Sequence, residues 1–311
     1  MVTALITHPA CLEHATPPGF RETPDRLRAV LTALGGERFA ALRRELAPLA
    51  TLDDIALVHD RAMIDDVLAD IPPEGSEGFG ALDQETFVSS GSGEAILRAA
   101  GAVVRGVDLV VTGEATNAFC AVRPPGHHAT PSAPMGFCVF NSVAIGARHA
   151  RLRHGIERVA IVDFDVHHGN GTQDAFAADP SVLYVSTHQS PLYPGTGRAS
   201  EHGRFGNIVN VPLPPGTGSD LFRRAVQSIV FPAVIGFAPE LMLISAGFDA
   251  HIRDGLAQLC LVEADYAWIT KELVEIAGRT AKGRIVSALE GGYDLSALAA
   301  SAAAHVAALM G

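Results

Sequence analysis

The chain has 311 residues, of which 48% are hydrophobic and 18% are charged, so it has ample material for a large buried core. Its 23 basic and 34 acidic residues give a net charge of −11 at pH 7, which disfavours electrostatic capture of nucleic acid or of an anionic membrane. No apolar run approaches the roughly 20 residues that span a bilayer, and residues 1–10 lack the pattern of a signal peptide, so we expect a globular cytoplasmic protein without membrane or nucleic-acid partners.

Short β-branched segments alternate with longer helical patterns along the whole chain. Buried strands are predicted at residues 4–7, 118–122, 158–163, 182–187, 241–245 and 284–289. Helices are predicted from Pro24 to the Gly35-Gly36 pair and at residues 91–105, 141–154, 219–235, 263–277 and 295–310, with Pro232 kinking or ending its helix. This alternation predicts a single α/β domain over residues 1–311, with a mostly parallel central sheet and helices on both faces.

In such a sheet, ligands bind beyond the carboxyl ends of the strands, and the densest polar cluster follows the strand at 158–163. Asp163, Asp165 and His167 alternate there, so on extended backbone their side chains face the same way. Burying them is costly unless they meet a cation or strong donors, and an Asp and a His two residues apart are ligand types that zinc accepts. A capping network at the strand end is the alternative, and it is favoured if no other strand ends in this way.

A second strand, at residues 241–245, does end in a similar way. Ala246 and Gly247 let the backbone turn, so Asp249 is expected to reach the same crevice as a third metal ligand. Two carboxylates and one imidazole would leave one position open for water or substrate, as in catalytic rather than structural zinc sites. A helix cap is the alternative for Asp249, and His251 is expected at the rim of the site.

Two further segments carry candidate catalytic side chains. His127 and His128 follow a rigid Pro-Pro-Gly turn, and adjacent imidazoles in different environments suit proton transfer, although a hydrogen-bonded loop is the alternative. Tyr293 follows a Gly-Gly pair and could donate to a developing oxyanion, but a Gly-Gly-Tyr turn alone is common. The other histidines, including His149 and His154, are expected to be ordinary surface or core residues.

Together these segments resemble the zinc-dependent histone deacetylase family, including class II-like bacterial amidohydrolases and acetylpolyamine amidohydrolases. The resemblance rests on P-P-G-H-H at 124–128, G-F-C at 136–138, D-F-D-V-H-H-G-N-G at 163–171, P-G-T-G at 194–197, S-A-G-F-D-A-H at 245–251 and E-G-G-Y at 290–293. It implies the arginase/deacetylase fold, one catalytic Zn²⁺ ion and hydrolysis of an N-acyl amide.

The resemblance also implies roles for individual residues of this chain. Asp165, His167 and Asp249 match the zinc ligands, His128 matches the general base and His127 its electrostatic partner. Tyr293 matches the hydroxyl that binds the substrate carbonyl and then the oxyanion.

Supporting positions match as well. Asp163 is expected to orient His127, whereas Asn170 faces His128 where class I members carry an aspartate. Without that anion the His128 imidazolium is less stabilised, so this ring should be neutral near pH 7. A structural K⁺ ion is implied at Asp163, Ser186 and Thr187, together with the backbone of Asp165 and His167.

The resemblance further implies a narrow substrate tunnel. Phe137 and Tyr193 match its aromatic walls beside Gly136, with ordinary loop packing as the alternative, and Asp83 falls near a rim aspartate that binds substrate amides. Leu256 stands where polyamine-selective relatives carry a glutamate, which favours an acyl-lysine-like substrate. Arg21 and Arg26 are expected to form exposed ion pairs, with a position at an acetate exit channel as the alternative.

The leading hypothesis is a deacetylase that releases an acyl group, in the first instance acetyl, from an N-acylated amine such as acyl-lysine. An acetylpolyamine deacetylase and a catalytically silent acyl-lysine binder are the alternatives. A binuclear manganese ureohydrolase is disfavoured because Gly169 stands where its D-x-H-x-D signature needs a second aspartate. A homo-oligomer remains open.

Overall fold

The structure is a computed structural model that describes residues 2–311. Within these residues, an eight-stranded sheet runs in the order β2-β1-β5-β10-β9-β6-β7-β8, and every neighbouring pair is parallel. Its strands are β1 (Thr3–Thr7), β2 (Arg43–Leu46), β5 (Asn117–Cys120), β6 (Val159–Asp163), β7 (Val182–Gln189), β8 (Ile208–Leu213), β9 (Leu241–Ala246) and β10 (Ile285–Leu289). The central strands are buried along their length, as expected when helices cover both faces.

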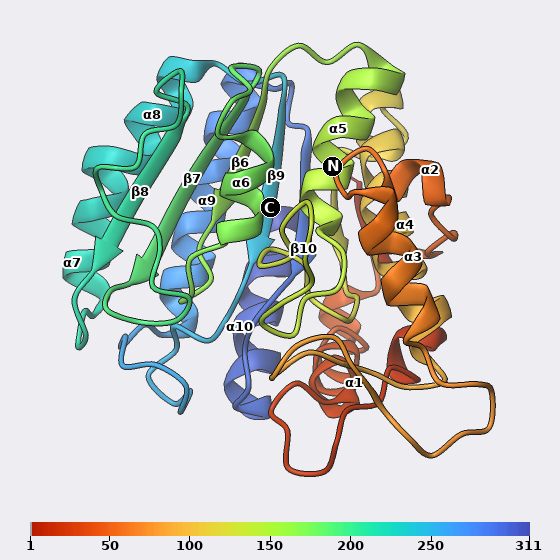
Figure 1. The fold of residues 1–311 in the computed structure, drawn as a ribbon. Helices are drawn as coiled ribbons and strands as arrows, with labels where there is room; N and C mark the ends of the chain where they lie inside the picture. The colour runs from red at the N-terminus through yellow and green to blue at the C-terminus, as the bar shows by residue number, and fades with distance from the viewer. Residues whose placement is uncertain (1) are drawn as a thin grey trace.

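The helices form two layers, one on each face of the sheet (Figure 1). One layer consists of α1 (Pro24–Ala33), α7 (Ser219–Ala225), α8 (Phe231–Phe237), α9 (Glu263–Thr280) and α10 (Leu295–Met310). The other consists of α4 (Ser92–Thr112), α5 (Ser142–His154) and α6 (Asn170–Phe176), with α2 (Leu52–Ile55) and α3 (Arg61–Ala69) outside them. A short antiparallel ribbon of β3 (Gly80–Ala81) and β4 (Phe87–Val88) stands apart from the main sheet. The predicted single-domain α/β architecture is therefore confirmed.

The differences from the predicted elements have local causes. The edge strands β2 and β8 were not predicted, and β2 is half exposed and carries the charged residues Arg43, Arg44 and Glu45 instead of a buried apolar run. The helix predicted at 219–235 is divided into α7 and α8 by a π-helical turn at Val226–Val230, and Pro232 stands in the first turn of α8. Since proline has no N–H to donate, the turn before it has to depart from regular helical bonding.

All strands of the main sheet point the same way, so their carboxyl ends share one edge. The loops that follow β5, β6, β7, β9 and β10 gather at that edge (Figure 1). No helix within residues 2–311 is both long and apolar enough to cross a membrane. The four cysteines are free thiols.

Candidate active site

Three predicted metal ligands meet at the carboxyl ends of β6 and β9, which are neighbours in the sheet. His167 Nδ1 lies 3.2 Å from Asp165 Oδ1 and 3.1 Å from Asp249 Oδ2. Both aspartates are only 1% exposed. One imidazole nitrogen and two carboxylate oxygens thus converge at the bottom of the site, within 4.8 Å of one another.

The surrounding backbone holds these carboxylates in place. The Gly291 amide donates to Asp165 Oδ2 at 2.8 Å, and the Val166 amide donates to Asp249 Oδ1 at 2.9 Å, so the other oxygen of each carboxylate faces His167. A β-carbon at Gly247 would overlap the Asp165 carboxylate. The donor set and the tight cradle around it fit a small divalent cation such as zinc.

Electrostatics supports the same fit. Burial and the neighbouring Asp165 charge raise the pKa of Asp249 to about 6. Two buried carboxylates of like charge repel each other, and a divalent cation between them would remove that repulsion.

The two adjacent histidines lie beside this cluster with their ring centroids 4.0 Å apart. His127 Nδ1 is 2.9 Å from Asp163 Oδ2, whereas His128 Nδ1 is 2.9 Å from the amide oxygen of Asn170. Burial disfavours both imidazolium ions, but the nearby Asp163 charge raises the pKa of His127 well above its ordinary value. Burial and the neighbouring His127 charge lower the pKa of His128. His128 is therefore the neutral member of the pair, and when Nδ1 donates to Asn170, Nε2 carries a free lone pair.

A buried glutamate that sequence reasoning did not single out holds the histidine loop. Glu290 Oε2 accepts hydrogen bonds from the Gly126 amide at 2.7 Å and the His127 amide at 3.2 Å. Its other oxygen accepts from the Ser245 hydroxyl at 3.0 Å. Burial raises the pKa of Glu290 to about 7. Its position directly after the last predicted strand and its place in the E-G-G-Y motif were the signals that could have marked it.

Tyr293 is fixed by the chain on both sides of it. Its amide donates to Asp254 Oδ2 at 2.6 Å, and the Arg26 guanidinium lies 4.8 Å from the centre of its ring. Arg26 also donates through Nε to the carbonyl oxygen of Gly292 at 2.6 Å. Burial raises the pKa of the Tyr293 hydroxyl, so it remains a proton donor. The expectation that Arg26 forms an exposed ion pair is wrong, because this side chain is completely buried.

Behind Tyr293, Glu22 lies between two buried guanidinium groups, and we call Glu22, Arg26 and Arg123 the arginine cluster. Arg26 Nη1 and Arg123 Nε are 2.7 Å and 2.6 Å from Glu22 Oε1, and Arg123 Nη2 is 2.5 Å from Oε2. Burial alone would raise the pKa of Glu22, but the Arg123 and Arg26 charges lower it to about 2. The cluster ties the segment before α1 to the loops of the site.

A cavity of about 180 Å³ leads from the surface to this site. Its lining residues are Glu85, His128, Gly136, Phe137, His167, Leu192, Tyr193, Leu256 and Tyr293. The predicted substrate residues Gly136, Phe137, Tyr193 and Leu256 all belong to this lining. Glu85 and Leu192 were not predicted, and no sequence pattern marks them.

Asp83, predicted as a rim aspartate, is held by its own turn. Its Oδ1 accepts hydrogen bonds from the Glu85 amide at 2.8 Å and the Thr86 amide at 2.5 Å, so it stabilises its own turn. It lines another cavity, next to Asp66 and Asp70. The tunnel lining includes Glu85 but not Asp83, although the charge of Asp83 acts on the Tyr193 hydroxyl, so its role at the rim stays a prediction.

The potassium residues predicted by resemblance lie on neighbouring strands. Asp163 on β6 pairs in register with Ser186 on β7, and Thr187 follows it, also buried. Asp163 Oδ1 accepts from the Asp165 amide at 3.1 Å, while the Ser186 hydroxyl is 2.9 Å from His188 Nδ1.

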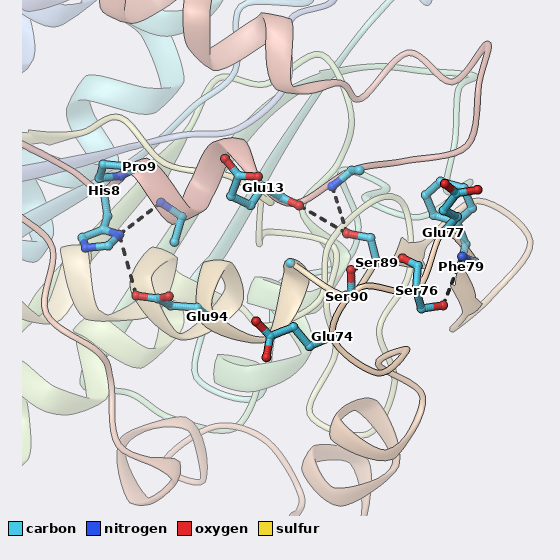
Figure 2. Close-up of a pocket in the computed structure, with 14 residues that line it drawn as sticks. His8, Pro9, Glu13, Glu74, Ser76, Glu77, Phe79, Ser89, Ser90 and Glu94 are labelled. Atoms are coloured by element: carbon cyan, nitrogen blue, oxygen red, sulfur yellow. Dashed lines mark hydrogen bonds and ion pairs between the residues drawn. The ribbon is translucent and has the colours of Figure 1, made fainter.

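A larger cavity, of about 880 Å³, lies elsewhere, between the segment around Pro9 and the loop at 74–79 (Figure 2). Four glutamates face it, Glu13, Glu74, Glu77 and Glu94, and His8 Nδ1 is 3.9 Å from Glu94. It shares no lining residue with the tunnel and contains no paired histidines. Catalytic geometry, and not volume, therefore identifies the smaller cavity as the candidate active site.

The chain is similar to known proteins in sequence and in fold. The family profile described as "Histone deacetylase domain" matches residues 20–309. The chain is 42% identical over 272 residues to histone deacetylase 14, chloroplastic, of Arabidopsis thaliana, covering 84% of this chain and 64% of that protein. It is 39% identical over 290 residues to the histone deacetylase-like amidohydrolase of Pseudomonas aeruginosa, covering 92% and 74%. The crystal structure of the HDA15 HD domain matches with a TM-score of 0.91 and 34% identity, covering 98% of this chain and 88% of that one.

Proposed function

Because the chain belongs to the histone deacetylase family, we propose that it is a zinc-dependent hydrolase that removes an acyl group from an N-acylated amine. The single observation that carries the proposal is the convergence of Asp165, His167 and Asp249 beside the neutral His128, at the bottom of a narrow tunnel. Asp165, His167 and Asp249 would hold one zinc ion. When bound, the ion supplies Lewis-acid polarisation of the amide carbonyl and lowers the pKa of water.

The histidine pair and Tyr293 supply the proton transfers and the charge stabilisation. His128 Nε2 takes a proton from water as the water oxygen bonds to the carbonyl carbon. The Tyr293 hydroxyl donates to the carbonyl oxygen as negative charge develops there. When the C–N bond breaks, the proton on His128 passes to the leaving amine, giving a carboxylate and a free amine. His127, held by Asp163, limits the positive charge that His128 retains between these steps.

The tunnel favours an unbranched acyl-lysine side chain. Phe137 and Tyr193 form aromatic walls, and the Tyr193 ring meets the His128 ring edge to face at 5.2 Å. The apolar Leu256 at the same tunnel offers no partner for a second ammonium group.

One observation favours acetylpolyamines as a second candidate substrate class. The exposed Glu85 also lines the tunnel, and its carboxylate would attract a cationic group outside the reacting amide. A polyamine carries such a cationic group, as does a peptide with a neighbouring lysine or arginine.

We test both substrates with zinc-loaded protein, comparing kcat/KM for acetyl-lysine peptides and for acetylated putrescine and spermidine. The expected result is hydrolysis of the peptides that stops on chelation and returns when zinc is restored. Preference for the acetylated polyamines would support the second candidate. Inactivity on every amide, with zinc bound, would contradict the proposal.

We also propose that K⁺ binds near Asp163, Ser186 and Thr187, together with the backbone of Asp165 and His167. The support is the side-by-side placement of these residues on β6 and β7 and the buried negative charge that a cation would offset. Replacing K⁺ by a bulky organic cation in the buffer should lower thermal stability, and an unchanged unfolding temperature would contradict the proposal.

A further inference from the structure

A second cluster of metal-type side chains lies at the opposite, amino-terminal edge of the sheet. Asp108 belongs to α4, whereas His149 and His154 belong to α5. These helices pack against each other, and four residues separate each from the strand that follows it, α4 from β5 and α5 from β6. The cluster is therefore separated from the candidate active site by the length of the strands.

The three side chains are directed at one point. His149 Nε2 and His154 Nε2 both lie 2.7 Å from Asp108 Oδ1, and the two ring centroids are 5.5 Å apart. One ligand atom from each residue lies within 4.8 Å of the other two. His149 is only 7% exposed, and its Nδ1 has no hydrogen-bond partner among the described residues. Its single polar contact is thus the one that faces Asp108.

The backbone makes this corner attractive to a cation. The carboxyl-terminal ends of α4 and α5 meet here, and each helix is followed by a glycine in left-handed conformation, Gly113 and Gly155. The end of a helix carries partial negative charge, which favours a positive ion. The nearby cations are already paired, since Arg105 contacts Glu45 at 2.9 Å and Arg151 lies 3.6 Å from Asp179.

We propose that Asp108, His149 and His154 form a second, non-catalytic binding site for a divalent transition metal of the zinc class. Two imidazoles and a carboxylate are suitable ligands for zinc, and imidazole selects against magnesium and calcium. Tetrahedral ligands at metal–ligand distances of about 2.0–2.2 Å lie roughly 3.3–3.6 Å apart. The two nitrogens, now 2.7 Å from Asp108 Oδ1, would therefore have to move away from it by about 0.6–0.9 Å. The partly exposed side chains of Asp108 and His154, at 34% and 20%, have room for this shift. Water would complete the coordination, and the ion would clamp α4 to α5.

The decisive experiment counts zinc ions per chain. Wild-type protein and the variant His154→Ala are dialysed to equilibrium against buffered zinc, and bound metal is measured by atomic emission. We expect two zinc ions in the wild type and one in His154→Ala. Excess zinc should also raise the unfolding temperature of the zinc-loaded wild type, and this increment should disappear in the variant.

Three further variants separate the sites and control for surface histidines. Asp108→Ala should also bind one zinc, while His202→Ala, which removes an exposed histidine outside the cluster, should retain two. Asp249→Asn should lose the zinc ion of the candidate active site, and excess zinc should still raise its unfolding temperature. A single zinc in the wild type, or two in His154→Ala, would overturn the proposal. His149 and His154 would then serve only as hydrogen-bond donors to Asp108.

Discussion

Two buried charge clusters lie close to the Tyr293 loop, and they differ in how their charges are balanced. In the arginine cluster, the one carboxylate of Glu22 faces the guanidinium groups of Arg26 and Arg123. The second cluster consists of the proposed zinc ligands Asp165, His167 and Asp249, and we call it the ligand cluster. In it, two carboxylates face the single imidazole of His167. The carboxylates of both clusters are buried, whereas the imidazole of His167 lines the tunnel.

The difference appears in the direction of the pKa shifts. The two arginines hold the pKa of Glu22 at about 2 despite its burial, whereas burial and a neighbouring carboxylate raise that of Asp249 to about 6. The first cluster carries its own counter-ions and has a structural role. In the second, despite burial, Asp165 and Asp249 raise the pKa of His167 to about 10, yet one imidazolium balances only one of the two carboxylates, and the remaining negative charge points to a metal.

The largest effect is expected from Asp249→Asn. Loss of one ligand should remove the catalytic zinc and lower kcat/KM by more than about 10³-fold. In chelator, the same variant should unfold at a higher temperature than the wild type, because the repulsion between Asp249 and Asp165 is gone. Zinc content, kinetics and calorimetry check these points. The exposed Asp220→Asn serves as the control, and retained activity in Asp249→Asn would refute the ligand assignment.

Glu22→Gln should have the next largest effect, on stability. Two buried guanidinium groups would lose their only carboxylate, which costs about 3–5 kcal/mol in the free energy of unfolding. Urea unfolding measures this, with the exposed Glu37→Gln as the matched control. A loss below about 1 kcal/mol would mean that the arginine cluster is not balanced as described.

The pH dependence of that stability has a definite sign. The pKa of Glu22 is lower in the folded protein, so its stabilising contribution is complete above its ordinary value of 4.5. It is lost as the pH falls from about 4.5 to about 2, because protonation breaks the pairs with both arginines. Glu22→Gln should remove this part of the acid dependence. If both proteins lose stability identically over that range, Glu22 is not the titrating group.

Tyr293→Phe should lower kcat by about 10²–10³-fold, because it removes one donor to the developing oxyanion. Zinc content and inhibitor affinity should be retained, since the ring still packs below Arg26. Loss of zinc from this variant would contradict the role given to the hydroxyl.

The smallest effect is expected from Asn170→Asp. An anion 2.9 Å from His128 Nδ1 should raise the pKa of this ring and move the acidic limb of the pH–rate profile upward by on the order of one pH unit. The limb is measured from kcat/KM between pH 5 and 8. An unmoved limb would show that His128 is not the group that must be unprotonated.

The central strands and the ligand cluster could both be predicted from the sequence because both depend on local patterns. Buried parallel strands are short apolar runs, and Asp165 and Asp249 follow two of them directly. Glu290 and Arg26 were missed because their roles depend on contacts between distant segments: Arg26 lies on α1, yet it binds the carbonyl oxygen of Gly292. Glu85 was missed as a tunnel residue because the tight turn capped by Asp83 decides which acidic side chain lines the tunnel.

Gly247 and Gly291 lie against the carboxylates of Asp165 and Asp249 and restrict the substitutions that this protein can tolerate. Adding a methyl group at Gly247 or Gly291 is the smallest change a side chain can undergo, yet it would press carbon into a buried carboxylate. Neither position touches substrate in the proposed reaction or donates to a metal through a side chain. Tolerance to substitution therefore need not increase with distance from the chemistry, and in a library of random variants these two positions should be as depleted as the ligands themselves.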